Sequence, residues 1–275
     1  MPIRLLAVDI DGTLLDSRYQ LAARNREALL AAHRAGIEVV LVTGRRFTFA
    51  LPVAEQIPFD HVLITSNGAL IKSRSGQSFC RQLLPREVAR RALEWTRRWR
   101  GYTLLAFDVE GEGQILIESL ENRTDMFLSW YERNKQYVRF QPLEQALTTD
   151  PLQVMYSGPL DRLSEIEQAL LAAPFRDEFK LLKTFYEARD LGIVDLIRRG
   201  CSKGAALAEW TQRRGFTRDQ VMAVGDNFND LEMLEFAGVP VVMGNAVPEL
   251  KSNGRHVTLD NDSAGLAEAI ERWAL

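Results

Sequence analysis

Apolar runs that each end in polar residues recur through the first part of the chain. The first run is broken only by Arg4 and leads directly into Asp9 and Asp11. Apolar runs of this length are typical of strands that are buried on both faces of a parallel sheet. Because they alternate with stretches of helical apolar spacing, they predict a doubly wound α/β core. The expected strands are residues 3–8, 37–42 and 61–65, and the expected helices are residues 21–35 and a segment from about Phe47 that Pro52 kinks or shortens.

The pattern changes after residue 69, where short strands are joined by tight turns and interrupted by helices. A hairpin around Ser75-Gly76 comes first, and Pro85 then opens a helix. Strands paired by short turns, with helices between them, predict an α+β module inserted into the first domain. The expected strands are residues 69–72, 77–83, 102–107, 114–118, 152–157, 179–187 and 193–197, and the expected helices are about 122–134, 161–172 and one from Pro85 with the apolar stripe Val88, Ala92, Trp95 and Trp99.

The alternation of strands and helices returns at Ser202, so the first domain resumes near that residue. We therefore expect an α/β core made of residues 1–83 and 197–275, and a cap made of residues 84–196. In the returning part, the expected helices are residues 202–213, one from near 230, 248–252 and 262–274, and the expected strands are 220–224, 239–243 and 256–258.

Length and composition narrow the class of protein. The 275 residues and the 46% hydrophobic content suit one large domain or two smaller ones with packed cores. A net charge of −3 gives no sign of a nucleic acid or membrane partner. The two cysteines have no metal or redox spacing, and the N-terminal apolar stretch is too short for a signal peptide. We therefore expect a cytoplasmic protein that is a monomer or a homodimer.

Asp9 and Asp11 end the first expected strand, and Gly12 and Thr13 follow them. Open α/β sheets bind ligands beyond the carboxyl ends of their strands, where these carboxylates would lie. Two buried like charges this close repel each other, and a divalent cation is the simplest compensation. Thr13 offers a hydroxyl and a backbone N–H to an anion. An Asp-Gly turn at a strand end explains the same residues equally well, so other parts of the chain must decide.

Polar residues in four separated segments of the chain support a metal site. Each lies at the carboxyl end of an expected strand or at the start of an expected helix, where a doubly wound sheet gathers a site. Mg²⁺ prefers a few carboxylates together with waters and phosphate oxygens. Such a set suits phosphoryl transfer, in which one carboxylate attacks phosphorus and a second one moves protons. The residues are Asp9, Asp11, Thr43, Lys203, Asp226, Asn229 and Asp230.

Four short motifs in this order resemble those of the haloacid dehalogenase superfamily. They are D-I-D-G-T from Asp9, T-G-R from Thr43, S-K-G from Ser202 and G-D-N-F-N-D from Gly225. S-N-G-A at 66–69 and M-G-N-A at 243–246 are similar to the Cof-type phosphatases of that superfamily. The resemblance spans the chain and implies a Rossmann-like core whose inserted cap selects the substrate. It also implies a Mg²⁺-dependent phosphatase of small phosphomonoesters, such as sugar phosphates, that works through an aspartyl-phosphate.

The resemblance assigns a role to each matching residue. Asp9 is similar to the nucleophile, and Asp11 to the acid/base that also offers Mg²⁺ its backbone carbonyl. Thr43 resembles the phosphate-binding hydroxyl, and Lys203 the shielding cation. The metal ligands implied are Asp9, Asp11, Asp226 and Asp230, the last either directly or through another ligand, and the substrate-binding residues implied are Asn67, Gly44, Arg45 and Asn229.

Some of these residues also have simpler explanations. Thr43 could simply cap a helix, since threonine is a common capping residue. Lys203 could be a solvated lysine at a helix start, but a cation there opposes the helix dipole, which favours a functional role. Turn or surface roles remain open for Asn67, Arg45 and Asn245.

One position departs from the family pattern, and two other functions are compatible with the motifs. Arg198 stands where the family often has a proline, which affects the expected shape of the second hinge. A phosphotransferase or mutase would pass the phosphoryl group to a second substrate instead of water. A catalytically silent phosphate-binding regulator is disfavoured because no motif residue is missing.

Overall fold

The chain divides into two units, which are described separately. The core unit comprises residues 1–81 and 201–275, and the inserted unit comprises residues 82–200. The inserted unit ends at residue 200, four residues after the expected end of the cap at residue 196. The reason is that strand β11 (Leu191–Arg198) pairs with β10 (Phe179–Tyr186) as far as Arg198. This computed structural model describes residues 1–121, 123–186, 190–252 and 255–275, so Asn122 and Glu187, the expected first residue of a helix and last residue of a strand, lie outside the described residues.

An eight-stranded sheet forms the centre of the core unit, in the order β14-β13-β12-β1-β2-β3-β4-β5. Its strands are parallel from β14 to β3, and β4 and β5 form the expected antiparallel hairpin. The doubly wound α/β core predicted from the sequence is confirmed. The strands are β1 Leu5–Asp9, β2 Glu38–Val42, β3 Val62–Thr65, β4 Leu70–Ser73, β5 Ser78–Arg81, β12 Val221–Gly225, β13 Val239–Val242 and β14 His256–Val257, and the helices are α1 Ala23–Arg34, α2 Phe47–Ala54, α7 Lys203–Arg213, α8 Leu231–Phe236 and α9 Gly265–Trp273.

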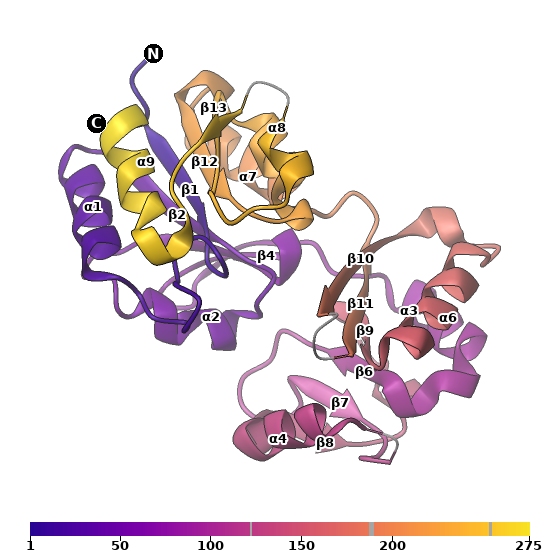
Figure 1. The fold of residues 1–275 in the computed structure, drawn as a ribbon. Helices are drawn as coiled ribbons and strands as arrows, with labels where there is room; N and C mark the ends of the chain where they lie inside the picture. The colour runs from indigo at the N-terminus through magenta and orange to yellow at the C-terminus, as the bar shows by residue number, and fades with distance from the viewer. Residues whose placement is uncertain (122, 187–189, 253–254) are drawn as a thin grey trace. The chain divides into compact units, whose positions relative to one another are not determined.

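Helices cover both faces of this sheet (Figure 1). Leu6 and Val8 of β1 pack with α1 and α9 on one face, whereas Leu5 and Ala7 pack with α7 and α8 on the other. Since successive side chains of a strand point to opposite faces, Asp9 points to the same face as Leu5 and Ala7. The end of β1 therefore presents its carboxylate towards the start of α7.

The inserted unit contains a six-stranded sheet in the order β10-β11-β9-β6-β7-β8. Within the described part of this unit, β7 and β8 pair in parallel and the other neighbouring strands pair antiparallel. Helices α3 and α6 pack with one side of this sheet in a separate apolar core, which gives the α+β architecture expected. The remaining strands are β6 Thr103–Ala106, β7 Ile115–Ile117, β8 Val138–Phe140 and β9 Gln153–Gly158, and the helices are α3 Arg86–Trp95, α4 Asp125–Asn134, α5 Leu143–Ala146 and α6 Leu160–Leu171.

The apolar stripe predicted for the helix after Pro85 is wrong in its last two members. Helix α3 ends at Trp95, and Trp99 lies in the following 3₁₀ segment, where it is 5% exposed. Trp95 is 45% exposed, because its indole reaches the surface of α6 and donates to the Ala169 carbonyl at 2.8 Å. The short elements β8 and α5 were not predicted, since three or four residues carry no usable periodicity.

Among the helices of the described residues, none is both long enough and apolar enough to cross a membrane.

Candidate active site

The polar residues of the four motifs meet at the carboxyl ends of the central strands. Asp9 is the last residue of β1, Thr43 follows β2, and Asp226 follows β12. These three strands are neighbours and run parallel, so their ends lie at one edge of the sheet. Lys203 reaches the same edge as the first residue of α7, whose N-terminus is capped by the hydroxyl of Ser202.

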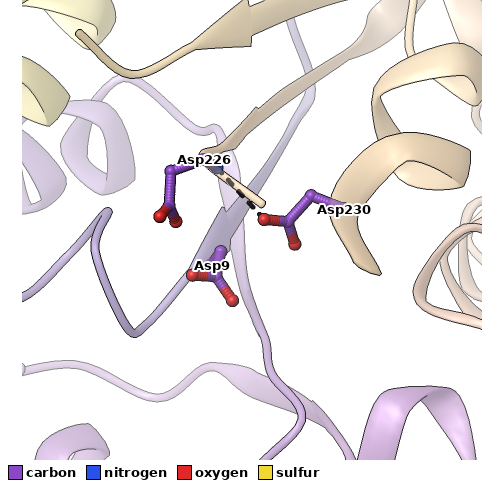
Figure 2. A group of neighbouring side chains, drawn as sticks. All are labelled: Asp9, Asp226 and Asp230. Carbon is purple, nitrogen blue, oxygen red and sulfur yellow. Dashed lines mark hydrogen bonds between the residues drawn. The ribbon is translucent and has the colours of Figure 1, made fainter. Parts of the chain in front are cut away.

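Three aspartates form an acidic cluster at this edge. Figure 2 shows Asp9, Asp226 and Asp230 pointing towards one another. One carboxylate oxygen of each aspartate lies within 4.8 Å of those of the other two. Lys203 Nζ donates to Oδ1 of Asp9 and to Oδ1 of Asp230, both at 2.6 Å. The lysine side chain is 1% exposed, and those of Asp9 and Asp230 are 4% and 0% exposed. One buried ammonium group among three carboxylates leaves a surplus of negative charge.

Burial and this surplus of negative charge raise the pKa of Asp226 and of Asp9. Burial and the charge of Asp230 raise the pKa of Asp226 to about 7, although a hydrogen bond from Thr13 lowers it in part. Burial and Asp230 also raise the pKa of Asp9, against the opposite effect of Lys203. For Lys203, burial lowers the pKa, but Asp230 and Asp9 together outweigh it and raise the pKa. The lysine therefore stays charged, and the remaining carboxylate charge calls for a further cation.

Asp230 differs from the other two aspartates because both of its oxygens are already bonded within the chain. Oδ1 accepts from Lys203, and Oδ2 accepts from the backbone N–H groups of Asp226 and Asn227 at 3.1 and 3.0 Å, the first drawn as a dashed line in Figure 2. These bonds close the turn after β12 and hold the lysine in place. Asp9 and Asp226 are thus the carboxylates best placed to hold a cation.

The T-G-R motif places a hydroxyl and a guanidinium at the same edge of the sheet. The Thr43 hydroxyl is almost fully buried and accepts from the Arg45 backbone N–H at 3.1 Å, so its own proton is left to donate. The Arg45 guanidinium forms a two-pronged ion pair with Asp11, with Nε–Oδ2 at 2.8 Å and Nη2–Oδ1 at 2.5 Å. Arg45, expected to bind substrate, is therefore occupied by a carboxylate of the first motif.

Asn67, Gly44 and Asn229 come together beside these groups. Asn67 Oδ1 accepts from Asn229 Nδ2 at 3.3 Å, and a Cβ on Gly44 would lie 3.0 Å from the same oxygen. The backbone of Ser66, Asn67 and Gly68 has φ values of 51°, 55° and 100°, a left-handed turn that costs free energy in the first two residues. Hydrogen bonds from Asn67 N to the Thr43 carbonyl and from Ser66 N to the Arg45 carbonyl hold this turn against the T-G-R motif.

Two contacts of the loop after β1 were not predicted. The Thr13 hydroxyl was expected to bind an anion, and it donates to Asp226 Oδ1 at 3.0 Å. Its partner in the structure is therefore a carboxylate of another motif. Asn245 Nδ2 donates to the Gly12 carbonyl at 2.9 Å. The M-G-N-A motif drew attention to Asn245, but nothing in the sequence identified its partner.

Comparison with known proteins identifies the family. Residues 6–270 match the family described as haloacid dehalogenase-like hydrolase, and the chain belongs to this family. The resemblance to Cof-type members of the haloacid dehalogenase superfamily is thereby confirmed.

Relatives and solved structures support this assignment along the whole chain. The chain is 29% identical to phosphatase YwpJ of Bacillus subtilis (strain 168), over 98% of this chain and 99% of that protein. It is 30% identical to 5-amino-6-(5-phospho-D-ribitylamino)uracil phosphatase YcsE of the same organism, over 99% and 96%. A haloacid dehalogenase-like hydrolase from Bacteroides thetaiotaomicron superimposes with a TM-score of 0.81 at 29% identity, over 98% of this chain and 99% of that one. Because the relatives are named phosphatases, the prediction that this protein is an enzyme of the phosphatase type is confirmed.

Proposed function

We propose that this protein is a Mg²⁺-dependent phosphatase that hydrolyses small phosphomonoesters through an aspartyl-phosphate on Asp9. The observation that carries the proposal is the position of Asp9. It is a buried carboxylate at the end of a central strand, with one oxygen held by Lys203 and two further carboxylates within 4.8 Å. Catalysis of phosphoryl transfer consists mainly of positioning and charge neutralisation, and this arrangement supplies both.

The residues present fit Mg²⁺. The donor set is made of oxygens, and three clustered carboxylates face one lysine. Burial and the negative charge of Asp230 raise the pKa of Asp226 to about 7, and a divalent cation would balance that charge. Asp9, Asp226 and the backbone carbonyl of Asp11 would hold the ion, while Asp230 orients Lys203 and the turn after β12. When bound, Mg²⁺ would neutralise charge on the transferring phosphoryl group.

The reaction then follows from the side chains of the chain itself. An Asp9 carboxylate oxygen attacks phosphorus, the bond to the leaving oxygen breaks, and Asp11 supplies that oxygen with a proton. In the second step Asp11 takes a proton from water, the water oxygen attacks phosphorus, and the Asp9 carboxylate is released with inorganic phosphate. Thr43 and Lys203 donate hydrogen bonds to the phosphoryl oxygens. Arg45 contacts both oxygens of Asp11 and so fixes the position of this carboxyl group.

The substrate class rests on relatives and on the division of the chain. YcsE is named as a phosphatase of a phosphorylated ribitylaminouracil, a small phosphomonoester. Every residue with a proposed chemical role belongs to the core unit, which leaves the inserted unit to select the leaving group. A cytoplasmic location and a monomeric or homodimeric state stay predictions from the sequence.

Phosphate release from a panel of phosphorylated metabolites tests the proposal. With Mg²⁺ and no acceptor other than water, we expect inorganic phosphate from several small monoesters and none in excess chelator. Activity that persists in chelator would contradict the metal chemistry. Phosphoryl transfer that requires a second substrate would favour a phosphotransferase, and no turnover of any monoester would favour a silent binding protein.

A further inference from the structure

Three asparagine side chains hold the backbone of the loop that follows β1. Nδ2 of Asn245 donates to the Gly12 carbonyl at 2.9 Å. Nδ2 of Asn25 donates to the Leu14 carbonyl at 3.1 Å, and Nδ2 of Asn261 donates to the Leu15 carbonyl at 2.9 Å. We name Asn25, Asn245 and Asn261 the asparagine clamp. Its members come from α1, from the loop after β13 and from the segment before α9, so residues far apart in the sequence converge on the loop that carries Asp11.

The amide groups of Asn245 and Asn25 have fixed orientations. Asn245 Oδ1 accepts from the backbone N–H of Asn261 at 3.0 Å, and Asn25 Oδ1 accepts from the backbone N–H of Ala267 at 3.1 Å. An amide whose oxygen accepts from an N–H and whose nitrogen donates to a carbonyl satisfies both partners in only one orientation. Asn245 is therefore a rigid bridge between the C-terminal segment and the Gly12 carbonyl.

Asn245 acts at the point where the loop lies against the acidic cluster. Gly12 has a φ of +84°, and a Cβ there would lie 2.3 Å from Asp226 Oδ2. The C=O and N–H of a trans peptide point in opposite directions, so holding the Gly12 carbonyl also fixes the direction of the Thr13 N–H. The Thr13 hydroxyl in turn donates to Asp226 Oδ1. Asn245 thus fixes the Gly12–Thr13 peptide, which lies one residue beyond Asp11 and leads to the Thr13 hydroxyl that donates to Asp226.

We propose that Asn245 is a positioning residue for the reaction, which sets the placement of Asp11 through the Gly12–Thr13 peptide. The inference rests on the proposed phosphatase function. Asn245 is the exposed member of the clamp, whereas Asn25 and Asn261 are buried and also support the fold. Loss of its side chain frees one peptide of the loop without opening a cavity, so its effect falls on catalysis more than on stability.

Asn245→Ala and Asn245→Asp test this role. Both variants remove the donor to Gly12, and the aspartate still accepts from the Asn261 backbone. Asn134→Ala is the matched control, because Asn134 Nδ2 makes the same kind of bond, to the Trp130 carbonyl at 2.8 Å, in α4 of the inserted unit. Two readouts are needed: steady-state kinetics with an alkyl phosphate and with nitrophenyl phosphate, and hydrogen exchange of residues 10–15.

The expected kinetic result is a lower kcat with a nearly unchanged KM. A misplacement of about 1 Å costs about 10²-fold in rate, so kcat of both variants should fall towards that value for the alkyl phosphate. KM should stay within about twofold, because Thr43 and Lys203 are untouched. The loss should be smaller for nitrophenyl phosphate, whose leaving group needs little help from Asp11. Asn134→Ala should match the unmutated protein.

The possible outcomes separate this inference from the proposed function. Faster exchange of residues 10–15 in Asn245→Ala, but not in Asn134→Ala, supports the clamp whether or not the protein is a phosphatase. Unchanged exchange overturns it. An active unmutated protein whose kcat survives Asn245→Ala, or whose KM alone rises, also overturns the positioning role. An inactive unmutated protein contradicts the proposed function, and the exchange measurement then decides on the clamp alone.

Discussion

The raised pKa of Asp226 predicts that the metal-free protein loses stability as the pH rises. The carboxyl group has an ordinary pKa of 3.8 and a folded-state pKa of about 7. Between these values the folded state holds a proton that the unfolded chain has released, so the free energy of unfolding falls with increasing pH. The difference of about 3 pKa units corresponds to at most about 4 kcal/mol, since each unit is worth about 1.4 kcal/mol and solvent screens part of the charge.

Urea denaturation of the metal-free protein between pH 5 and pH 8 measures this loss. From pH 5 to about pH 7, a span of about two pH units, the folded protein keeps a proton on Asp226 that the unfolded chain has released. Its free energy of unfolding should therefore fall by up to about 3 kcal/mol more than that of Asp226→Asn. Asp177→Asn, which removes an exposed carboxylate of the inserted unit, is the control and should behave like the unmutated protein. Saturating Mg²⁺ should stabilise the unmutated protein most at high pH, because it binds the carboxylate form.

Equal pH slopes for Asp226→Asn and the unmutated protein would refute this reasoning. They would mean that Asp226 keeps an ordinary pKa in the folded state, and that the site tolerates its negative charge without a cation. A flattened slope in Asp177→Asn would show that the effect is not specific to the acidic cluster.

Three further predictions follow from the same geometry. Asp11→Asn should give a burst of nitrophenol from nitrophenyl phosphate followed by a slow phase, whereas Asp9→Asn should give no burst; a burst from Asp9→Asn would exclude it as the nucleophile. Acid–base help is worth about 10²–10⁴-fold, so alkyl phosphates should suffer a loss of that order in Asp11→Asn. Lys203→Met should lower the free energy of unfolding by about 3–5 kcal/mol, because it leaves buried carboxylates uncompensated; an unchanged urea midpoint would argue against the buried pairs. A core unit made by joining residue 81 to residue 201 should fold and hydrolyse an aryl phosphate with little preference among metabolites. If its kcat/KM ratios between metabolites equalled those of the whole protein, the inserted unit would not select the substrate.

The sequence predicts the doubly wound core because its strands are buried on both faces and so appear as continuous apolar runs. It also places Asp9, Thr43 and Asp226 at neighbouring strand ends, since parallel strands bring their carboxyl ends to one edge. Lys203 stands out locally, because a cation at a helix start opposes the helix dipole. These features depend on residues that are close together in sequence, or on topology that follows from the order of the elements.

The contacts between motifs could not be predicted in the same way. The Arg45 side chain had several chemically reasonable partners, and only the folded backbone brings it to Asp11. The bonding of Asp230 to Lys203 and to two backbone N–H groups depends on side-chain orientation, which spacing does not encode. Asn25 lies outside the motifs and reads as an ordinary polar residue of an amphipathic helix, although it is buried and bonded at both ends of its amide.

Chemical trapping of the phosphorylated enzyme tests the central claim most directly. Asp11→Asn should accumulate the intermediate when it is incubated with nitrophenyl phosphate and Mg²⁺. Borohydride reduces an acyl phosphate to the alcohol, so quenching with borohydride should convert Asp9 to homoserine, which peptide mass spectrometry locates. The account predicts this modification at Asp9 and its absence in chelator. Nitrophenol release with no modification, or with modification at another residue, would contradict an aspartyl-phosphate on Asp9.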